Sequence, residues 1–222
     1  MVEYYVTKGK LELTNGNPTV IVNGEAKALS KSEFILWTGL HWNILNKESL
    51  KASFDRKRKK YHIFDDVSFE KTLERLKTRE LIASKSDYLA ADALYNLIKN
   101  LYIVPVGVVT ELKRKMLFLY MLFIKGVPLK ECRSFAKNFK ISDFEKQIVI
   151  FTKRFKVSPA ELIRIDEKNL WSIGSEDKIV SLAYKENENT SILENDTRFS
   201  DSKSKMTSAI VNLYLKKQII FE

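Results

Sequence analysis

The segment Asp65–Ala90, DDVSFEKTLERLKTRELIASKSDYLA, decides the fold that we predict for this chain. Its first half repeats apolar residues at helical spacing, so that Phe69, Leu73 and Leu76 fall on one side of a helix. In its second half, the β-like runs 81–83 and 88–90 flank a polar turn at 85–87, a pattern typical of a β-ribbon. The segment therefore predicts a helix over about residues 65–79, followed by a ribbon over residues 80–90.

Two helices are predicted before this segment, and β-hairpins before them. Ser30-Lys31-Ser32-Glu33 is a capping box, and it opens a helix with an apolar face formed by Phe34, Trp37, His41, Ile44 and Leu45. Asn46 begins a short second helix with Leu50 and Phe54 four residues apart. Alternating runs around Asn15-Gly16 and Asn23-Gly24 predict hairpins near the N-terminus, with residues 26–29 pairing with residues 19–22.

Three helices followed by a β-ribbon resemble a winged helix-turn-helix, and the likeness covers residues 26–90, about a third of the chain. The stretch from Val20 to Glu33 is also similar to the hairpin and first helix of response-regulator effector domains. The resemblance implies a DNA-binding unit whose third helix enters the major groove of a duplex.

The outward side of the predicted helix 66–79 carries groups that suit this role. Lys71, Arg75 and Thr78 fall opposite the apolar stripe, with Arg79 at the edge. Arginine can pair with guanine through two hydrogen bonds, and lysine or threonine can reach a phosphate or a base edge. Lys85, in the predicted wing, is placed to touch the DNA backbone or the minor groove. The alternative is an amphipathic surface helix whose charges only meet water.

Positive charge is concentrated in two blocks of a chain whose net charge is +10. Residues 1–60 hold 11 basic and 6 acidic side chains, and residues 110–156 hold 12 and 4. The densest run lies between the second and third predicted helices, and we expect it to contact phosphates: Arg56, Lys57, Arg58, Lys59 and Lys60. A solvated basic surface is the alternative explanation.

Pro105 and Gly107 mark the predicted boundary between an N-terminal domain of residues 1–104 and a helical second domain of residues 105–222. The apolar helix expected at 108–125 would be buried in the second domain or in a dimer seam. A motif at 135–145 is echoed at 151–161, sixteen residues later, and each copy ends in a capping box. The second copy resembles a helix-turn-helix, although a plain helical bundle explains the same residues.

The C-terminal helix, about residues 203–217, and the β-like tail 218–221 echo the predicted third helix and ribbon. They are interpreted either as half of a second winged helix or as a dimerisation helix.

The sequence offers little for catalysis, so we expect no enzyme activity and no cofactor. His41 lies on an apolar helix face, as a core residue would, and His62 follows the basic run. No HExxH, CxxC, GxGxxG or Walker A motif occurs, so neither a metal nor a nucleotide site is predicted. Cys132 is the only cysteine, and the longest apolar run, 116–124, is too short to span a bilayer, so a cytoplasmic protein without a membrane partner is expected.

These observations predict a mainly α fold with small β content, and a homodimeric, double-stranded-DNA-binding transcriptional regulator. A tandem winged-helix replication initiator or segregation factor, with both halves on one DNA, is the second hypothesis. A protein-interaction module is the third.

Overall fold

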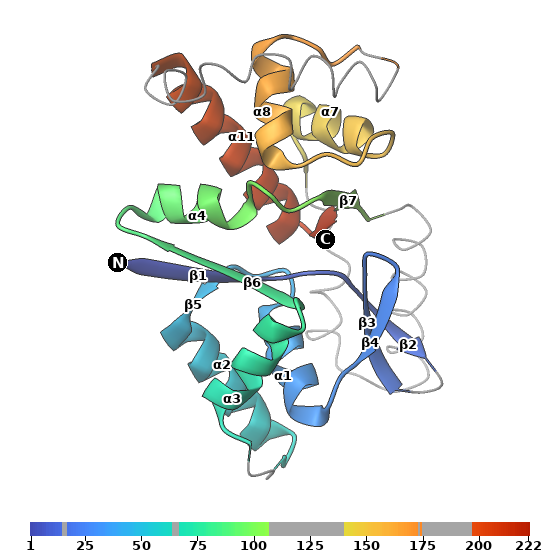
Figure 1. Ribbon diagram of the computed structural model, residues 1–222, viewed down its shortest axis with the longest axis vertical. Coiled ribbons are helices and arrows are strands. Elements are labelled where there is room, and N and C mark those ends of the chain that lie inside the picture. Colours follow the sequence, from blue (N-terminus) through green and yellow to red (C-terminus); the bar gives the residue numbers. More distant parts are fainter. Residues whose placement is uncertain (15–16, 64–66, 107–139, 173, 175–196) are drawn as a thin grey trace.

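The computed structural model describes residues 1–14, 17–63, 67–106, 140–172, 174 and 197–222. Within these ranges the chain is a mixed α+β structure with seven helices and three small antiparallel sheets, which confirms the expected combination of helices with a small β content. Its buried apolar side chains form two clusters. We call the parts around them the N-terminal lobe (the described residues up to 87) and the C-terminal lobe (the described residues from 88 on); in Figure 1 the C-terminal lobe lies above the N-terminal lobe.

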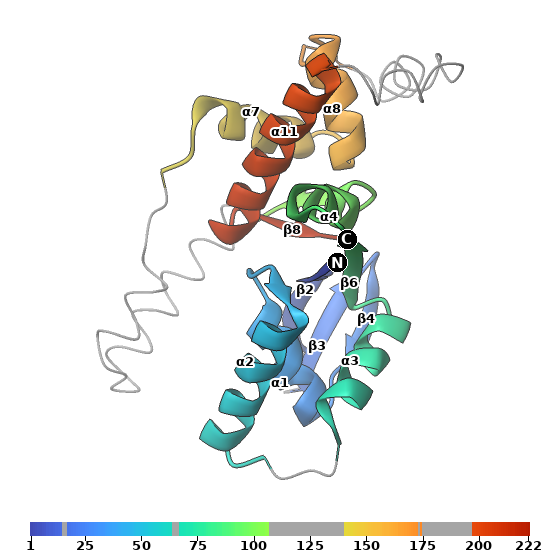
Figure 2. The same ribbon diagram turned by 90° about the vertical axis from the view of Figure 1, so that its left-hand side faces the viewer.

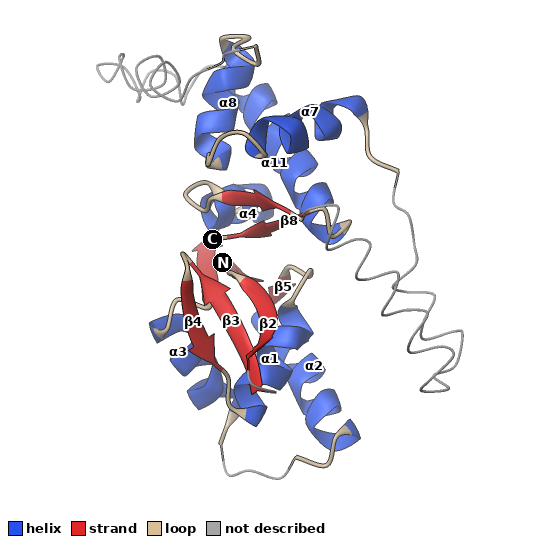
Figure 3. Ribbon diagram, turned by 90° about the vertical axis from the view of Figure 1, so that its right-hand side faces the viewer, coloured by secondary structure: helices blue, strands red, loops and turns tan. Residues whose placement is uncertain are grey.

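Four strands begin the N-terminal lobe: β1 (Val2–Thr7), β2 (Lys10–Thr14), β3 (Asn17–Val22) and β4 (Glu25–Ala28). Strands β2, β3 and β4 form a meander (Figure 3), and the expected second hairpin is present, with residues 19–22 pairing with residues 25–28, one residue earlier than the expected 26–29. Gly9, between β1 and β2, has a φ of +85°, and a Cβ there would lie 2.5 Å from Val22 Cγ2. Only glycine therefore allows the chain to turn this close to β3.

Three helices follow: α1 (Lys31–Leu40), α2 (Lys47–Lys60) and α3 (Phe69–Thr78). The predicted capping box is present, because Ser30 Oγ accepts from the Glu33 amide at 3.3 Å and the Ser30 amide donates to Glu33 Oε2 at 2.8 Å. The expectation of a short second helix with the basic run after it was wrong. Helix α2 includes residues 56–60, because Leu50 and Phe54 anchor one face of the helix and Arg58 continues it one turn further.

The predicted β-ribbon at 80–90 was also wrong. Residues 82–87 form one straight strand, β6 (Ile82–Asp87), and Tyr88 and Leu89 lead directly into helix α4 (Ala90–Ile98). The partner of β6 is the N-terminal strand β1, which pairs antiparallel with it from Val2↔Asp87 to Thr7↔Ile82. Strand β6 therefore pairs with a strand that is distant in the chain, and not with residues 88–90 across a local turn, as the sequence pattern predicted. On its other side β1 pairs with the two-residue strand β5 (Leu45–Asn46), giving the order β5-β1-β6.

This sheet is the wall shared by the two lobes, because successive residues of a strand point to opposite faces. Tyr5 and Ile82 belong to the core of the N-terminal lobe, whereas Val6 and Ala83 pack into the core of the C-terminal lobe. Helix α4 covers the face of the sheet that carries Val6 and Ala83, as Figures 1 and 2 show, and packs on both β6 and β1.

The C-terminal lobe contains α4 and five further described elements: β7 (Ile103–Pro105), α7 (Asp143–Thr152), α8 (Pro159–Glu167), α11 (Thr197–Leu215) and β8 (Ile219–Phe221). The capping boxes expected at Ser142 and Ser158 are both present, and Pro159 stands in the first turn of α8. The helices expected near 108–125 and 128–138, Cys132 and the segment 175–196 lie outside the described residues.

The two lobes repeat one order of elements. Ser30 and Ser142 each open a helix with a capping box, and sixteen residues later Asn46 and Ser158 each cap the next helix. The residue before each second cap bonds or pairs with the first described strand of its lobe: Leu45 lies opposite Tyr5 of β1, and Val157 O accepts from the Ile103 amide of β7 at 3.1 Å. The repeat that the sequence shows at sixteen residues is therefore the spacing of two successive helices within one lobe.

The last helix of each lobe ends in the same way. Glu80 after α3 has a φ of +56°, and Lys217 after α11 has a φ of +62°. The next amide, of Leu81 or Gln218, donates to the carbonyl five residues back at 2.9 Å, and the following strand pairs antiparallel with the first strand of its lobe. An ion pair repeats as well: Arg79 holds Glu33 of α1 at 2.8 Å, and Lys216 holds Glu145 of α7 at 2.8 Å.

A buried polar chain joins the two lobes. The Tyr214 hydroxyl lies 2.8 Å from Thr7 Oγ1 and accepts from the Trp42 amide at 3.1 Å. Trp42 Nε1 donates to the Ile219 carbonyl at 3.3 Å. Burial raises the pKa of Tyr214 to about 12, so this hydroxyl stays protonated at neutral pH.

Candidate nucleic-acid interface

Helix α3 has the two faces that the sequence predicts. Ser68 caps it, its side chain accepting from the Lys71 amide at 3.2 Å. One side of the helix is buried and consists of Phe69, Thr72, Leu73 and Leu76. On the other side, Lys71, Glu74, Arg75 and Thr78 are exposed. The expected exposure of Lys71, Arg75 and Thr78 is thus found, while their contact with DNA stays a prediction.

The five consecutive cations at the end of α2 divide into two groups. Arg58 lies over the Phe54 ring at 5.5 Å and donates to the carbonyls of Ile63 and Val67, each at 3.3 Å. It therefore braces the connection between α2 and α3. Lys57 is half-buried, and burial together with the neighbouring Lys60 lowers its pKa.

Arg56, Lys59 and Lys60 are exposed at the same helix end. The Lys60 ammonium lies 5.7 Å from the centre of the Tyr61 ring. Only these three members of the basic run are therefore placed to meet a polyanion.

The end of α2 and the start of α3 lie at the same end of the N-terminal lobe, as Figure 2 shows. Phe54 and Phe69 bring the two helices together with ring centroids 5.7 Å apart, and Lys51 bridges to Glu70 at 3.4 Å on the surface. The positive end of the α3 dipole adds to the cations of α2 there. Exposed cations at the end of α2 and the N-terminus of α3 therefore lie at one end of the lobe, next to the exposed face of α3.

Arg79 and Lys85 do not belong to this surface. The Arg79 guanidinium donates to Glu33 Oε1 at 2.8 Å and to the Ala28 carbonyl at 2.6 Å, so it links α3 to α1 and β4. Lys85 is exposed but pairs with Tyr4 in the sheet, which puts it on the face that α4 covers rather than on the α3 side. Sequence reasoning could not separate these two cations from Lys71 and Arg75, because their partners lie far away in the chain.

The helix-turn-helix pattern at 151–161 also has its expected packing. Phe151, Phe155, Val157, Leu162 and Ile165 are all buried. Lys153, Arg154 and Lys156 are exposed beside them, and Lys156 lies over the Tyr102 ring at 4.8 Å. Much of the second basic block, from residue 110 to residue 139, lies outside the described residues.

The two histidines lie in different surroundings. The His41 ring stacks on Trp37 at 4.4 Å, lies 4.0 Å from the Trp42 ring, and places Nδ1 3.2 Å from Thr7 Oγ1. Burial, with a smaller effect from Lys217, lowers its pKa to about 3. His62 is exposed after α2. In the described ranges there is no cluster of three acidic, histidine or cysteine side chains that could hold a metal ion.

Comparison with protein-family models, curated protein sequences and solved structures found no match. None of the helices within the described ranges is both long enough and apolar enough to cross a bilayer.

Proposed function

We propose that this protein is a sequence-specific DNA-binding regulator that lays α3 in the major groove. The observation that carries the proposal is the exposed face of Lys71, Arg75 and Thr78, beside the exposed cations at the end of α2. The groove is wide enough for a helix, an arginine can read guanine, and the neighbouring cations bind phosphates without reading sequence.

The N-terminal lobe is, in this proposal, a winged helix with a changed chain order. Helices α1, α2 and α3 are preceded by β-hairpins, and one strand, β6, follows α3 where the winged-helix resemblance implies a ribbon of two. The second strand of the wing is supplied by β1, which comes first in the chain and lies between β5 and β6. The surface offered to DNA depends on this arrangement in space and not on the order of the chain.

We further propose that α11, the last helix of the C-terminal lobe, does not read DNA as α3 does. The matching ends of α3 and α11 set a register in which Lys71 corresponds to Ser208 and Arg75 to Asn212. Helix α11 therefore has no cation at the two positions that carry the proposal in α3. This favours a regulator over an initiator that reads DNA with both halves, and a homodimer is then expected to bind two half-sites.

The test is a selection of duplexes from a random pool by the full-length protein, followed by binding curves at several salt concentrations. We expect Arg75→Ala to weaken binding by about 1 to 3 kcal/mol and to relax specificity at one base position. Lys71→Ala is expected to weaken all sequences more evenly. Lys10→Ala, which removes an exposed cation of β2, is the matched control and should leave binding unchanged.

Two results would contradict the proposal: no enriched sequence in the selection, or equal binding by Arg75→Ala and the unmodified protein. If the α3 face instead binds an acidic protein surface, as an interaction module would, duplex binding will be absent.

A further inference from the structure

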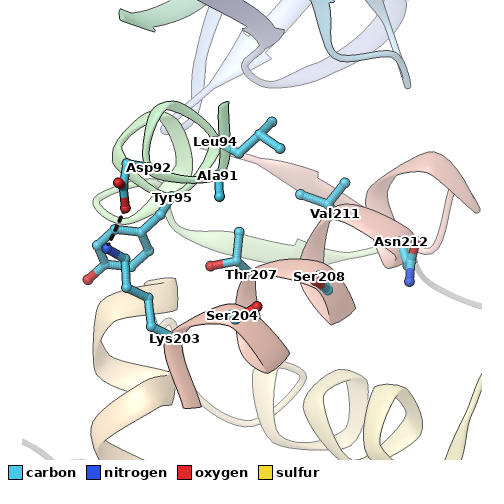
Figure 4. Close-up of a pocket in the computed structure, with 10 residues that line it drawn as sticks. All are labelled: Ala91, Asp92, Leu94, Tyr95, Lys203, Ser204, Thr207, Ser208, Val211 and Asn212. Carbon is cyan, nitrogen blue, oxygen red and sulfur yellow. Dashed lines mark hydrogen bonds and ion pairs between the residues drawn. The ribbon is translucent and has the colours of Figure 1, made fainter. Parts of the chain in front are cut away.

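A cavity of about 490 Å³ lies between α4 and α11. Its size falls within the range of small-molecule sites in proteins. Figure 4 shows its lining: Ala91, Asp92, Leu94 and Tyr95 from α4, and Lys203, Ser204, Thr207, Ser208, Val211 and Asn212 from α11. Because Ser208 and Asn212 correspond to Lys71 and Arg75 of α3, the cavity lies on the face that carries the proposed reading surface in the other lobe.

Thr207 is the residue that points to a ligand. Its side chain lines the cavity and its residue is only 9% exposed, yet its Oγ1 has no hydrogen-bond partner among the described residues. By contrast, the buried Thr152 of α7 donates to the Ile148 carbonyl at 2.9 Å. A buried hydroxyl without a partner is costly, so its presence in a cavity wall suggests that a bound molecule supplies the missing hydrogen bond.

The wall around Thr207 is rich in neutral hydrogen-bonding groups. Ser204, Ser208 and Asn212 follow one another at intervals of four residues, so they form a stripe along one face of α11. Hydroxyl and amide groups both donate and accept, as the hydroxyl groups of a ligand do. Across the cavity, Leu94 of α4 supplies an apolar surface, with Val211 of α11 beside the stripe.

The two charges in the lining neutralise each other. Lys203 Nζ lies 2.9 Å from Asp92 Oδ1 and 4.5 Å from the centre of the Tyr95 ring. A charged ligand would have to break this pair, whereas a neutral one leaves it intact. The lining therefore selects for a small uncharged molecule with several hydroxyl groups on one side and an apolar surface on the other.

We propose that this cavity is a binding site for a neutral polyhydroxyl compound of the size of a monosaccharide or a nucleoside. The inference goes beyond DNA binding and does not depend on it. Because α4 continues directly from β6 and packs on the shared sheet, the site also lies next to the wall that supports the N-terminal lobe.

The experiment measures the melting temperature and the calorimetric binding of the full-length protein with neutral pentoses, hexoses and the four ribonucleosides. Free lysine and glutamate serve as charged comparison compounds. At least one neutral compound is expected to bind and to raise the melting temperature, since a ligand that binds only the folded state stabilises it. Failure of every neutral compound to bind, or binding of the charged compounds alone, would overturn the proposal.

The variant Thr207→Val separates a ligand site from a structural role. Removing an unpartnered hydroxyl should leave the melting temperature of the free protein unchanged or raise it, by about 2 to 4 °C. The same change should weaken ligand binding at least about tenfold, the size expected from the loss of one hydrogen bond. Thr152→Val, which removes a partnered hydroxyl, should lower the melting temperature and leave ligand binding unchanged.

Ser208→Ala is a second variant in which ligand binding is measured. Ser208 is exposed, so its substitution should not affect folding. Undiminished ligand binding by both Thr207→Val and Ser208→Ala would show that the compound binds elsewhere and would overturn the assignment of the cavity.

Discussion

At the scale of single residues, cations that look alike in the sequence have different roles. Arg79 holds Glu33, whose side chain is 8% exposed, whereas Lys10 holds Glu12, whose side chain is 41% exposed. The pKa of Glu33 is lowered: hydrogen bonds from Ser30 and Arg79 outweigh the opposing effect of burial.

The substitution Arg79→Met leaves the buried Glu33 carboxylate without its ion-pair partner. It should therefore lower the free energy of unfolding by about 1 to 3 kcal/mol. Urea unfolding measures this, with Lys10→Met as a control expected to cost less than about 1 kcal/mol; equal costs would contradict the assignment.

His41 should make stability depend on pH. Its pKa is about 3 in the folded protein and near the ordinary 6.5 when the chain is unfolded. Below pH 6.5 the unfolded state therefore binds more protons, so the free energy of unfolding falls as the pH falls, by at most about 1.4 kcal/mol per pH unit. The slope is about half its maximum at pH 6.5 and is nearly absent above about pH 7.5, where the unfolded chain also leaves this histidine neutral. Urea unfolding between pH 5 and 8 should show this slope in the unmodified protein and a flatter curve in His41→Gln; identical curves would rule out a buried neutral ring.

At the scale of elements, α2 combines a structural side with a side for phosphate contact. Arg56 and Lys59 are exposed, so alanine at both positions should change stability by less than about 0.5 kcal/mol each. On a bound duplex, each lost phosphate contact should reduce the slope of log affinity against log salt by about 0.9. Arg58→Ala, which frees the carbonyls of Ile63 and Val67, should instead lower the melting temperature. A salt slope that does not change in the Arg56→Ala, Lys59→Ala protein would exclude these residues from the interface.

The elements that the sequence predicts well are those with local causes. The capping boxes at Ser30, Ser142 and Ser158 involve residues three apart, and each begins a helix where expected. The stripe of Phe69, Leu73 and Leu76 likewise places α3 and its exposed face. The error at residues 80–90 has a non-local cause: Lys85-Ser86-Asp87 is suited to a turn, but β1, about 80 residues earlier, offers a complete row of backbone partners.

The candidate site also divides into features with local causes and features that depend on tertiary contacts. Exposure of Lys71 and Arg75 follows from helical periodicity alone, but the capture of Arg79 by Glu33 and Ala28 depends on tertiary contacts. The cavity also has a local signal, the stripe of Ser204, Ser208 and Asn212 on the last helix. What the sequence alone could not show is that α4 lies across this stripe.

At the scale of the whole molecule, the two lobes are joined by a few specific contacts in addition to the shared sheet. The Tyr214 hydroxyl forms hydrogen bonds with Thr7 Oγ1 and with the Trp42 amide, and both of these groups belong to the N-terminal lobe. Tyr214→Phe keeps the ring that stacks on Phe221 but leaves the Trp42 amide without its partner and Thr7 with only its contact to His41 Nδ1. The variant should lose about 1 to 3 kcal/mol of unfolding free energy, and the Trp42 amide should exchange its hydrogen faster.

Tyr102→Phe is the matched control, because Tyr102 is 41% exposed and its hydroxyl removal should cost less than about 0.5 kcal/mol. Hydrogen exchange followed by mass spectrometry reports each lobe separately. If the lobes unfold together, Tyr214→Phe will speed exchange in the strands of both β1 and β8, since each is part of the same cooperative unit. Faster exchange confined to β8 would show instead that the C-terminal lobe opens alone, and the hydroxyl would then be a local contact rather than the link between the lobes.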